Sequence, residues 1–298
     1  MWVPITIAAA LAQTTRNAAQ RHLTAQLGTL GATLVRFLYG LPFAIAWLGV
    51  VALIGGGPLA TPHAAFFAWS VVGGVAQIVG TALLLQTMHE RNFAVGVAYS
   101  KTEVVQVAIF SIVLLGERVT TQVALAVACG TLGVLFLTPV DRERPWRSLL
   151  RGFTSRSAML GLGCGACMAF ASVAFRAATQ EVPNAGFVLS AALALVTAQT
   201  VQTLLLGGWL LARAPGVVRR TLAAWRVSLF AGLMGATASA CWFTAFAITS
   251  ATSVRTVGLV EMLFSYVVSR RFFREHLSGR ELVGIALIVV GVIVITLA

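Results

Sequence analysis

Two glutamates lie inside apolar segments of this chain, and each is followed by a second glutamate 14 residues later. The first copy of the pattern reads TEVVQVAIFSIVLLGER and the second reads VEMLFSYVVSRRFFREH. A shift of 158 residues places Glu103 on Glu261 and Glu117 on Glu275. A carboxylate inside the hydrocarbon layer of a membrane is energetically expensive, and such side chains are usually functional. Glu103 and Glu261 are therefore predicted to bind a proton or the amino group of a substrate.

Two basic residues, Lys101 and Arg255, precede these glutamates by two and six positions. A guanidinium such as that of Arg255 can bind a carboxylate through two parallel hydrogen bonds. The mixed charges suit a zwitterionic or amphiphilic substrate such as an amino acid. The alternatives are a structural ion pair of Glu103 with Lys101, Arg255 or Arg36, and an Arg255 side chain that extends to the membrane surface. Because two residues turn a helix by about 200°, Lys101 and Glu103 are expected to face different surroundings.

Four further polar or aromatic residues are candidates for lining a substrate cavity. Gln13 and Asn17 are one turn apart and so share a face of the first apolar segment. Tyr99 lies close before Glu103, and Trp242 lies well inside its own segment. The alternatives are hydrogen bonds to a neighbouring helix for Gln13 and Asn17, and an interfacial anchor for the aromatic residues.

The composition excludes a soluble domain and predicts an all-α polytopic membrane protein. The chain is 58% hydrophobic and only 10% charged, whereas soluble domains carry about 25% charged residues. Its apolar segments have the length of about 20 residues that a transmembrane helix needs. They are continuous rather than alternating, which favours helices over strands. The ten expected helices are 3–22, 29–53, 64–88, 93–115, 120–139, 158–179, 185–211, 227–248, 252–272 and 280–297.

The net charge of +12 is interpreted as a topology signal and not as a nucleic-acid-binding surface. Sixteen of the 21 Lys and Arg residues fall in the loops on one side of the ten expected helices. The positive-inside rule places these loops in the cytoplasm. Both termini are then extracytoplasmic, and the expected location is a plasma membrane of the bacterial type, the inner membrane in a Gram-negative cell.

The two copies of the pattern predict two five-helix repeats, residues 1–139 and residues 157–298, joined by a basic cytoplasmic linker at 140–156. An odd number of crossings makes the second repeat enter the membrane from the opposite face. Inverted repeats of this kind are typical of secondary transporters, which bind their substrate near the membrane midplane between the repeats. Glu103 and Glu261 both lie near the middle of their helices, where such a site is expected.

The sequence resembles the EamA-type ten-helix permeases of the drug/metabolite transporter superfamily. The resemblance rests on TEVVQVAIFSIVLLGERVT, on its echo VEMLFSYVVSRRFFREHLS and on the glycine-containing helix after each. Members often carry Glu-Pro in helices 4 and 9, where this chain has Val104 and Met262 after the glutamates, so the resemblance does not imply a proline-induced helix break. Gly116 keeps the later Gly-Glu motif, whereas Arg274 replaces its glycine in the second repeat. Members are usually drawn with cytoplasmic termini, which is the reverse of the orientation that the loop charges predict.

Glu117 and Glu275 are interpreted as structural, because acidic groups before a helix complement its dipole. Thr120 and Ser278 can cap the same two helices. Small residues let membrane helices approach closely, so helices 5 and 10 are expected to pack together or against a second copy in a homodimer. The glycines concerned are Gly130, Gly133, Gly284 and Gly291.

The function expected from these observations is secondary transport, by alternating access, of a small organic metabolite, an amino acid-like compound or a drug. Outward transport is the preferred direction, and the expected driving force is either proton antiport through Glu103 or Glu261 or passive facilitation. The expected partners are the substrate and the lipid bilayer, with no cofactor, metal ion or nucleic acid. Two alternatives remain: a flippase for a lipid-linked sugar or similar amphiphile, and an intramembrane enzyme, which the absence of HExxH and of a paired nucleophile and histidine disfavours.

Overall fold

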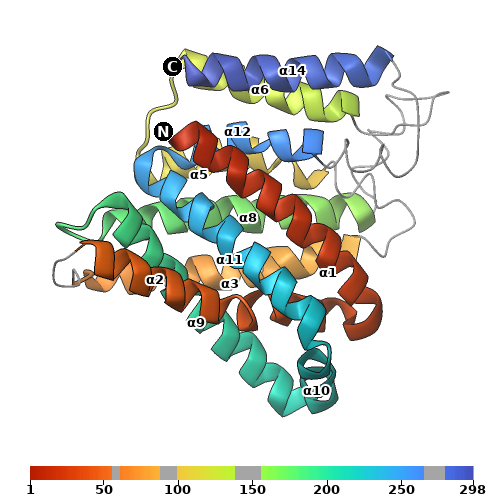
Figure 1. The fold of residues 1–298 in the computed structure, drawn as a ribbon. Helices are drawn as coiled ribbons and strands as arrows, with labels where there is room; N and C mark the ends of the chain where they lie inside the picture. The colour runs from red at the N-terminus through yellow and green to blue at the C-terminus, as the bar shows by residue number, and fades with distance from the viewer. Residues whose placement is uncertain (56–60, 88–98, 138–155, 265–278, 298) are drawn as a thin grey trace. The chain divides into compact units, whose positions relative to one another are not determined.

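The computed structural model describes residues 1–298 apart from 56–60, 88–98, 138–155, 265–278 and 298. Its described residues form helices and connections, with no strand among them (Figure 1). The predictions for Glu275, Ser278 and nearly all of the linker at 140–156 lie outside the described residues. The helices are α1 (Trp2–Leu38), α2 (Leu41–Gly55), α3 (Ala64–Thr87), α5 (Glu103–Leu115), α6 (Thr121–Leu137), α8 (Arg156–Gln180), α9 (Phe187–Arg213), α10 (Pro215–Ala223), α11 (Trp225–Ile248), α12 (Ala251–Gly258) and α14 (Gly279–Thr296).

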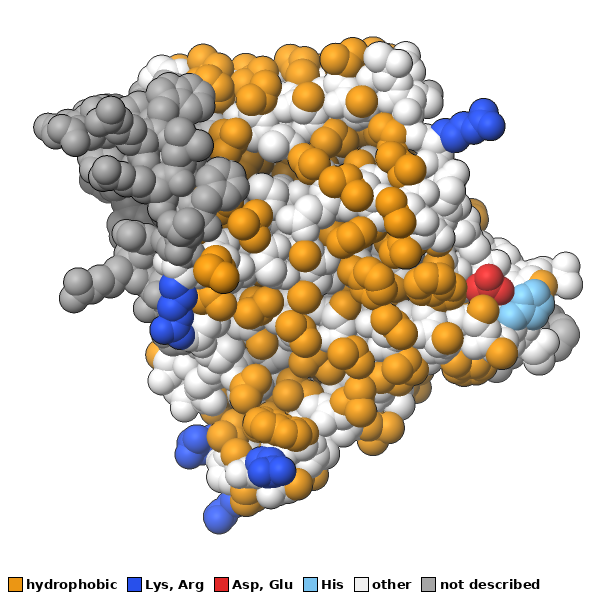
Figure 2. All heavy atoms as spheres, turned by 180° about the vertical axis from the view of Figure 1, so that it is seen from behind, with side chains coloured by type: hydrophobic (Ala, Val, Ile, Leu, Met, Phe, Trp, Pro, Cys, Tyr) orange, Lys and Arg blue, Asp and Glu red, His pale blue; other side chains and the backbone are white. Residues whose placement is uncertain are grey.

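Apolar helices of membrane-spanning length confirm the expected all-helical class. Within the described residues, five segments are long and apolar enough to cross a membrane: His22–Gly55, Ala64–Thr87, Arg156–Gln180, Phe187–Arg213 and Trp225–Ile248. Three apolar helices are shorter: Glu103–Leu115, Thr121–Phe136 and Leu282–Thr296. Hydrophobic side chains are also widespread on the surface seen in Figure 2. Surface of this kind is compatible with contact to lipid tails.

The helices divide into two compact units, each of which draws on both halves of the sequence. Unit 1 contains residues 1–78 and 171–250, and unit 2 contains residues 79–170 and 251–298. The helices α3 and α8 therefore contribute residues to both units. In unit 1, α11 runs along α1 (Figure 1), and α9 packs against α1, α2 and α11.

The label α1 covers two helical segments that meet in a kink at Gly28, where the backbone angles are the non-helical φ 71° and ψ 174°. This kink agrees with the boundary expected between the helices 3–22 and 29–53. A positive φ of this kind is readily adopted by glycine, which has no Cβ atom. The helix then ends at Leu38, and α2 begins at Leu41. The residues expected to form one second helix are thus divided between the end of α1 and α2.

In unit 2, α6 and α14 pack side by side along their lengths (Figure 1), as expected for helices 5 and 10. A Cβ atom at Gly133 would lie 2.7 Å from the backbone oxygen of Gly284, so only glycine permits this approach. The Thr120 hydroxyl accepts a 3.3 Å hydrogen bond from the backbone N–H of Val123 and caps the start of α6. Packing of the two helices builds an apolar core that includes Val104, Val127, Val134, Leu259 and Ile288.

Candidate functional site

A network of four buried charges in unit 2 brings together the sequence-predicted residues Glu103, Glu261, Lys101 and Arg255. The Lys101 Nζ atom lies 3.1 Å from Glu261 Oε2, and the Arg255 Nη2 atom lies 2.8 Å from Glu103 Oε1. Their side chains are between 9% and 18% exposed. Each ion pair joins a residue of the first sequence copy to a residue of the second. The two cations and two carboxylates balance one another, as a low-dielectric site requires.

Ion pairing within this network resolves two alternatives from the sequence. Glu103 pairs with Arg255, whereas Lys101 pairs with the glutamate 160 positions away. Lys101 and Glu103 do face different partners, as expected from their spacing. Arg36, the third partner considered for Glu103, belongs to unit 1, where it is only 4% exposed. Each ion pair thus takes its cation from one sequence copy and its carboxylate from the other.

Interrupted helices position both glutamates, although neither is followed by proline. The regular α-helix is interrupted by a turn at Lys101 and Thr102 immediately before Glu103, and by a turn at Leu259 before Glu261. The backbone N–H of Val104 donates to the Lys101 oxygen at 3.4 Å, three residues earlier. Met262 repeats this short bond at 2.9 Å, donating to the Leu259 oxygen. A tightened turn of the 3₁₀ type thus contains each glutamate, at corresponding places in the two copies.

Hydroxyl groups and close packing stabilise the interruption before Glu103. The Thr102 hydroxyl donates to the backbone oxygen of Tyr99 at 2.6 Å and accepts a hydrogen bond from Gln106 Nε2 at 2.9 Å. Side chains that bond nearby backbone groups offer the chain an alternative to regular helix. On the adjoining α8, a Cβ atom at Gly165 would lie 3.0 Å from the Ser100 oxygen. Sequence reasoning missed these contributions because it considered only proline as the cause of a break.

The space inside the charge network is small. The cavity that Lys101, Glu103, Arg255 and Glu261 line has a volume of about 20 Å³, which is enough for one water molecule and too small for a metabolite. Glu103 Oε1, although close to Arg255, is buried and accepts no hydrogen bond from the described residues. The carboxylate is therefore neutralised by the charge of Arg255, although this contact lacks hydrogen-bond geometry.

The other four sequence-predicted residues, Tyr99, Gln13, Asn17 and Trp242, are placed by hydrogen bonds in both units. Tyr99, at 6% exposed, belongs to the interruption before Glu103 in unit 2. In unit 1, the indole Nε1 of Trp242 donates to Gln13 Oε1 at 3.0 Å, which ties α11 to α1. Asn17 Oδ1 accepts a 2.7 Å hydrogen bond from Arg16 Nη2. The structure thus joins Gln13 to Trp242, whereas it gives Asn17 a neighbour on its own helix.

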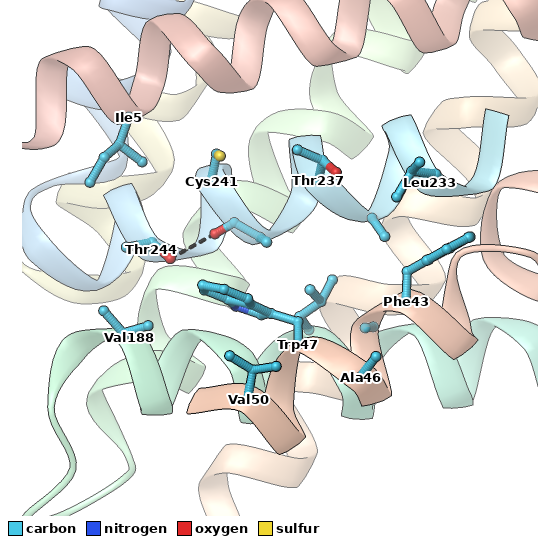
Figure 3. A pocket seen from close by; sticks show the side chains of 14 residues that line it. Ile5, Phe43, Ala46, Trp47, Val50, Val188, Leu233, Thr237, Cys241 and Thr244 are labelled. Carbon is cyan, nitrogen blue, oxygen red and sulfur yellow. Dashed lines mark hydrogen bonds between the residues drawn. The ribbon is translucent and has the colours of Figure 1, made fainter. Parts of the chain in front are cut away.

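A larger cavity of about 570 Å³ lies within unit 1 among α1, α2, α9 and α11. Its lining is almost entirely apolar and includes Phe43, Trp47 and Leu195. Figure 3 shows the Trp47 ring reaching between α2 and α11. Pockets for small organic molecules have volumes of about 300–1,000 Å³ and are mostly apolar with a few polar groups. The size and lining of this cavity therefore fit an organic molecule.

The apolar pocket has few polar groups, which are the indole N–H of Trp47 on α2 and three side chains of α11. The Thr244 hydroxyl donates to the backbone oxygen of Ala240 at 2.7 Å, so it is satisfied within its helix (Figure 3). Thr237 and Cys241 also line the cavity, and no charged residue does so. The pocket thus favours an uncharged surface on whatever binds. Sequence reasoning did not find it, because its apolar residues look like those of any membrane helix.

Comparisons with known proteins agree along nearly the whole chain. The EamA-like transporter family matches residues 1–138 and 155–297. One crystal structure of a protein is similar over 99% of this chain and 96% of its own chain, with a TM-score of 0.69. Its sequence identity of 18% means that this likeness shows the fold alone. No curated protein matches the sequence.

Proposed function

The chain belongs to the EamA-like transporter family, and hence to the drug/metabolite transporter superfamily, and from this premise we propose that it exports a small organic compound by alternating access. Family membership and apolar helices make it an integral, multi-pass membrane transporter. We further propose that the chain crosses the membrane ten times in two inverted repeats and that both termini are extracytoplasmic. The proposed membrane is a plasma membrane of the bacterial type. The loop charges support this orientation.

The observation that carries the proposal is the crossed pairing of Lys101 with Glu261 and of Arg255 with Glu103. Each pair links the two sequence copies, so a movement of one repeat against the other would have to rearrange both pairs. Removing one partner from a buried ion pair costs about 3–5 kcal/mol. The two ion pairs can therefore stabilise one conformation. The conformation changes only when another charged group replaces a partner that an ion pair has lost.

Protonation of one carboxylate is the proposed trigger. A neutral Glu103 or Glu261 no longer balances its cation, and the cation must then find another anion or move toward water. A proton on Glu103 Oε1 would have to displace Arg255, and one on Glu261 Oε2 would have to displace Lys101, so protonation would break an ion pair.

The apolar pocket of unit 1 is proposed to take the hydrophobic body of the transported compound. The volume of the pocket, about 570 Å³, and its few polar groups suit an amino acid-like compound or a drug with a large apolar part. The same apolar lining also favours the second candidate function, in which a lipid-linked amphiphile places its chain in this pocket. Competition between the two ligand classes distinguishes these functions.

Transport by the purified protein in lipid vesicles tests the proposal. A panel of amino acids, nucleosides, polyamines and cationic drugs is first screened for thermal stabilisation of the protein at two pH values, because a ligand of the native state raises its apparent stability. Uptake of the best ligand is then driven by a pH gradient in wild type, Glu103→Gln and Glu261→Gln. Glu117→Gln is the control, since it removes a carboxylate that lies outside the network.

The expected result is pH-driven transport in wild type and Glu117→Gln, and its loss in both network variants. Transport that survives both Glu103→Gln and Glu261→Gln would refute proton coupling through these carboxylates. Stabilisation by lipid-linked compounds alone, without any soluble ligand, would favour the flippase.

A further inference from the structure

The basic segment at 212–226 forms an ordered helix, where only a charged connection was expected. Pro215 stands at the first position of α10, where its fixed φ angle and missing N–H suit a helix start. Val218 points to the protein and is only 8% exposed. It packs in an apolar cluster with residues of α1 and α9, which are Leu34, Phe37, Leu206 and Leu210. The helix is thus mounted on membrane-spanning helices of unit 1.

Hydrogen bonds hold the end of α10 as well. The Tyr39 hydroxyl, between α1 and α2, donates to the backbone oxygens of Thr221 at 3.2 Å and Leu222 at 3.4 Å. Thr221 is fully buried, with an exposed fraction of 0%. One side of α10 is therefore fixed against the protein, which determines what the opposite side presents.

The outward side of this region is strongly basic. Arg219 and Arg220 of α10 are exposed, and so are Arg213 at the end of α9 and Arg226 in the first turn of α11. The segment at 212–226 contains no Asp or Glu. Figure 2 shows Lys and Arg side chains gathered at its lower edge, where α10 lies. Four like charges on a fixed scaffold attract anions.

Apolar side chains are exposed beside these arginines. Leu222 and Trp225 are each 53% exposed, and the Arg226 guanidinium carbon lies 5.4 Å from the centroid of a Trp225 ring. Tryptophan is enriched where a protein meets the membrane interface. A soluble anion would neutralise the arginines but leave Leu222 and Trp225 in water. A phospholipid supplies a phosphate for the first group and an acyl region for the second.

We propose that α10, together with Arg213 and Arg226, is a docking surface for the headgroups of anionic phospholipids. Basic amphipathic helices bind anionic membrane surfaces through this combination of charge and apolar contact. Positive loop charge alone orients a membrane protein whatever the structure of the loop. An ordered helix that buries Val218 and exposes Arg219 and Arg220 also fixes the spacing between the cations.

The fluorescence of Trp225 measures occupancy of this surface in the full-length protein. The protein is placed in bilayers that contain spin-labelled phosphatidylglycerol or spin-labelled phosphatidylcholine as quencher. Subtracting the signal of Trp225→Phe isolates the quenching of Trp225 from that of the other tryptophans. The expected result in wild type is stronger quenching by phosphatidylglycerol, which weakens as salt concentration rises.

The double variant R219Q/R220Q is expected to lower the preference for phosphatidylglycerol about 25-fold, at about fivefold per arginine. The variant R219K/R220K keeps the charge and should keep most of the preference. The control R118Q removes an exposed arginine in unit 2 and should leave the preference unchanged. Melting of the variants in detergent verifies that they remain folded.

Equal quenching of wild-type Trp225 by the two lipids at physiological salt would overturn the proposal. A preference that R219Q/R220Q retains in full would also overturn it. Loss of the preference in an excess of inorganic phosphate at constant ionic strength would show a general anion site in place of a lipid site.

Discussion

Substitution of Glu261 by glutamine is expected to destabilise the protein by about 3 kcal/mol. The change leaves the Lys101 ammonium, 18% exposed and 3.1 Å from the former carboxylate, without its counter-charge. Loss of one partner from a buried pair costs about 3–5 kcal/mol. The lower end applies because Lys101 keeps some contact with solvent and remains attracted by Glu103. With an unfolding entropy of about 2.1 cal/mol/K per residue, about 3 kcal/mol corresponds for a chain of this size to a melting temperature lower by about 5 °C.

A double-mutant cycle separates the ion pair from other effects of the substitution. Lys101→Gln and Glu261→Gln are each expected to destabilise, whereas the double variant K101Q/E261Q should recover most of the loss because it leaves no isolated charge. The exposed pair of His63 and Glu181 is the control, with atoms 3.2 Å apart and side chains 63% and 34% exposed. His63→Gln should change stability by less than about 1 kcal/mol.

Melting of the purified variants in one detergent, at one pH and protein concentration, provides the assay. The reasoning is refuted if the effects of Lys101→Gln and Glu261→Gln simply add in the double variant. It is equally refuted if Glu261→Gln costs no more than His63→Gln, since the network would then behave like a solvated surface pair.

Three further substitutions test the packing, the pocket and a helix cap. Gly133→Ala should destabilise the protein by about 1–3 kcal/mol, because the new Cβ atom would lie 2.7 Å from the Gly284 backbone oxygen. The control Gly208→Ala has open space at its Cβ position and should stabilise the protein by up to about 1 kcal/mol. Equal shifts of the melting temperature in the two variants would contradict this reasoning. Ala240→Leu fills part of the apolar pocket and should abolish stabilisation by any ligand that binds there, without lowering the melting temperature of the free protein. Thr120→Ala removes the cap of α6 and should lower stability by about 1 kcal/mol in the same melting assay.

Local sequence patterns predicted the helices well and their interruptions poorly. Hydropathy depends on neighbours along the chain, so it placed apolar helices at most of the expected positions. Gly40 and Pro42 mark the division of the second expected helix at Tyr39, but a reading by hydropathy passes over them, whereas the tightened turns at Glu103 and Glu261 have no proline. These features depend on tertiary contacts, such as the approach of Gly165 to the Ser100 oxygen, that no window of sequence contains.

The sequence by itself determined that this is a helical membrane transporter and that Glu103 and Glu261 are its notable buried acids. Only the tertiary structure decided which charges meet, because the pairing of Lys101 with Glu261 spans 160 positions and depends on how α12 packs against α5. The apolar pocket and the placement of α10 were likewise decided only by the tertiary structure. Composition and periodicity report the environment of each helix, whereas a cavity or an ion pair arises from the surfaces that two helices turn toward each other.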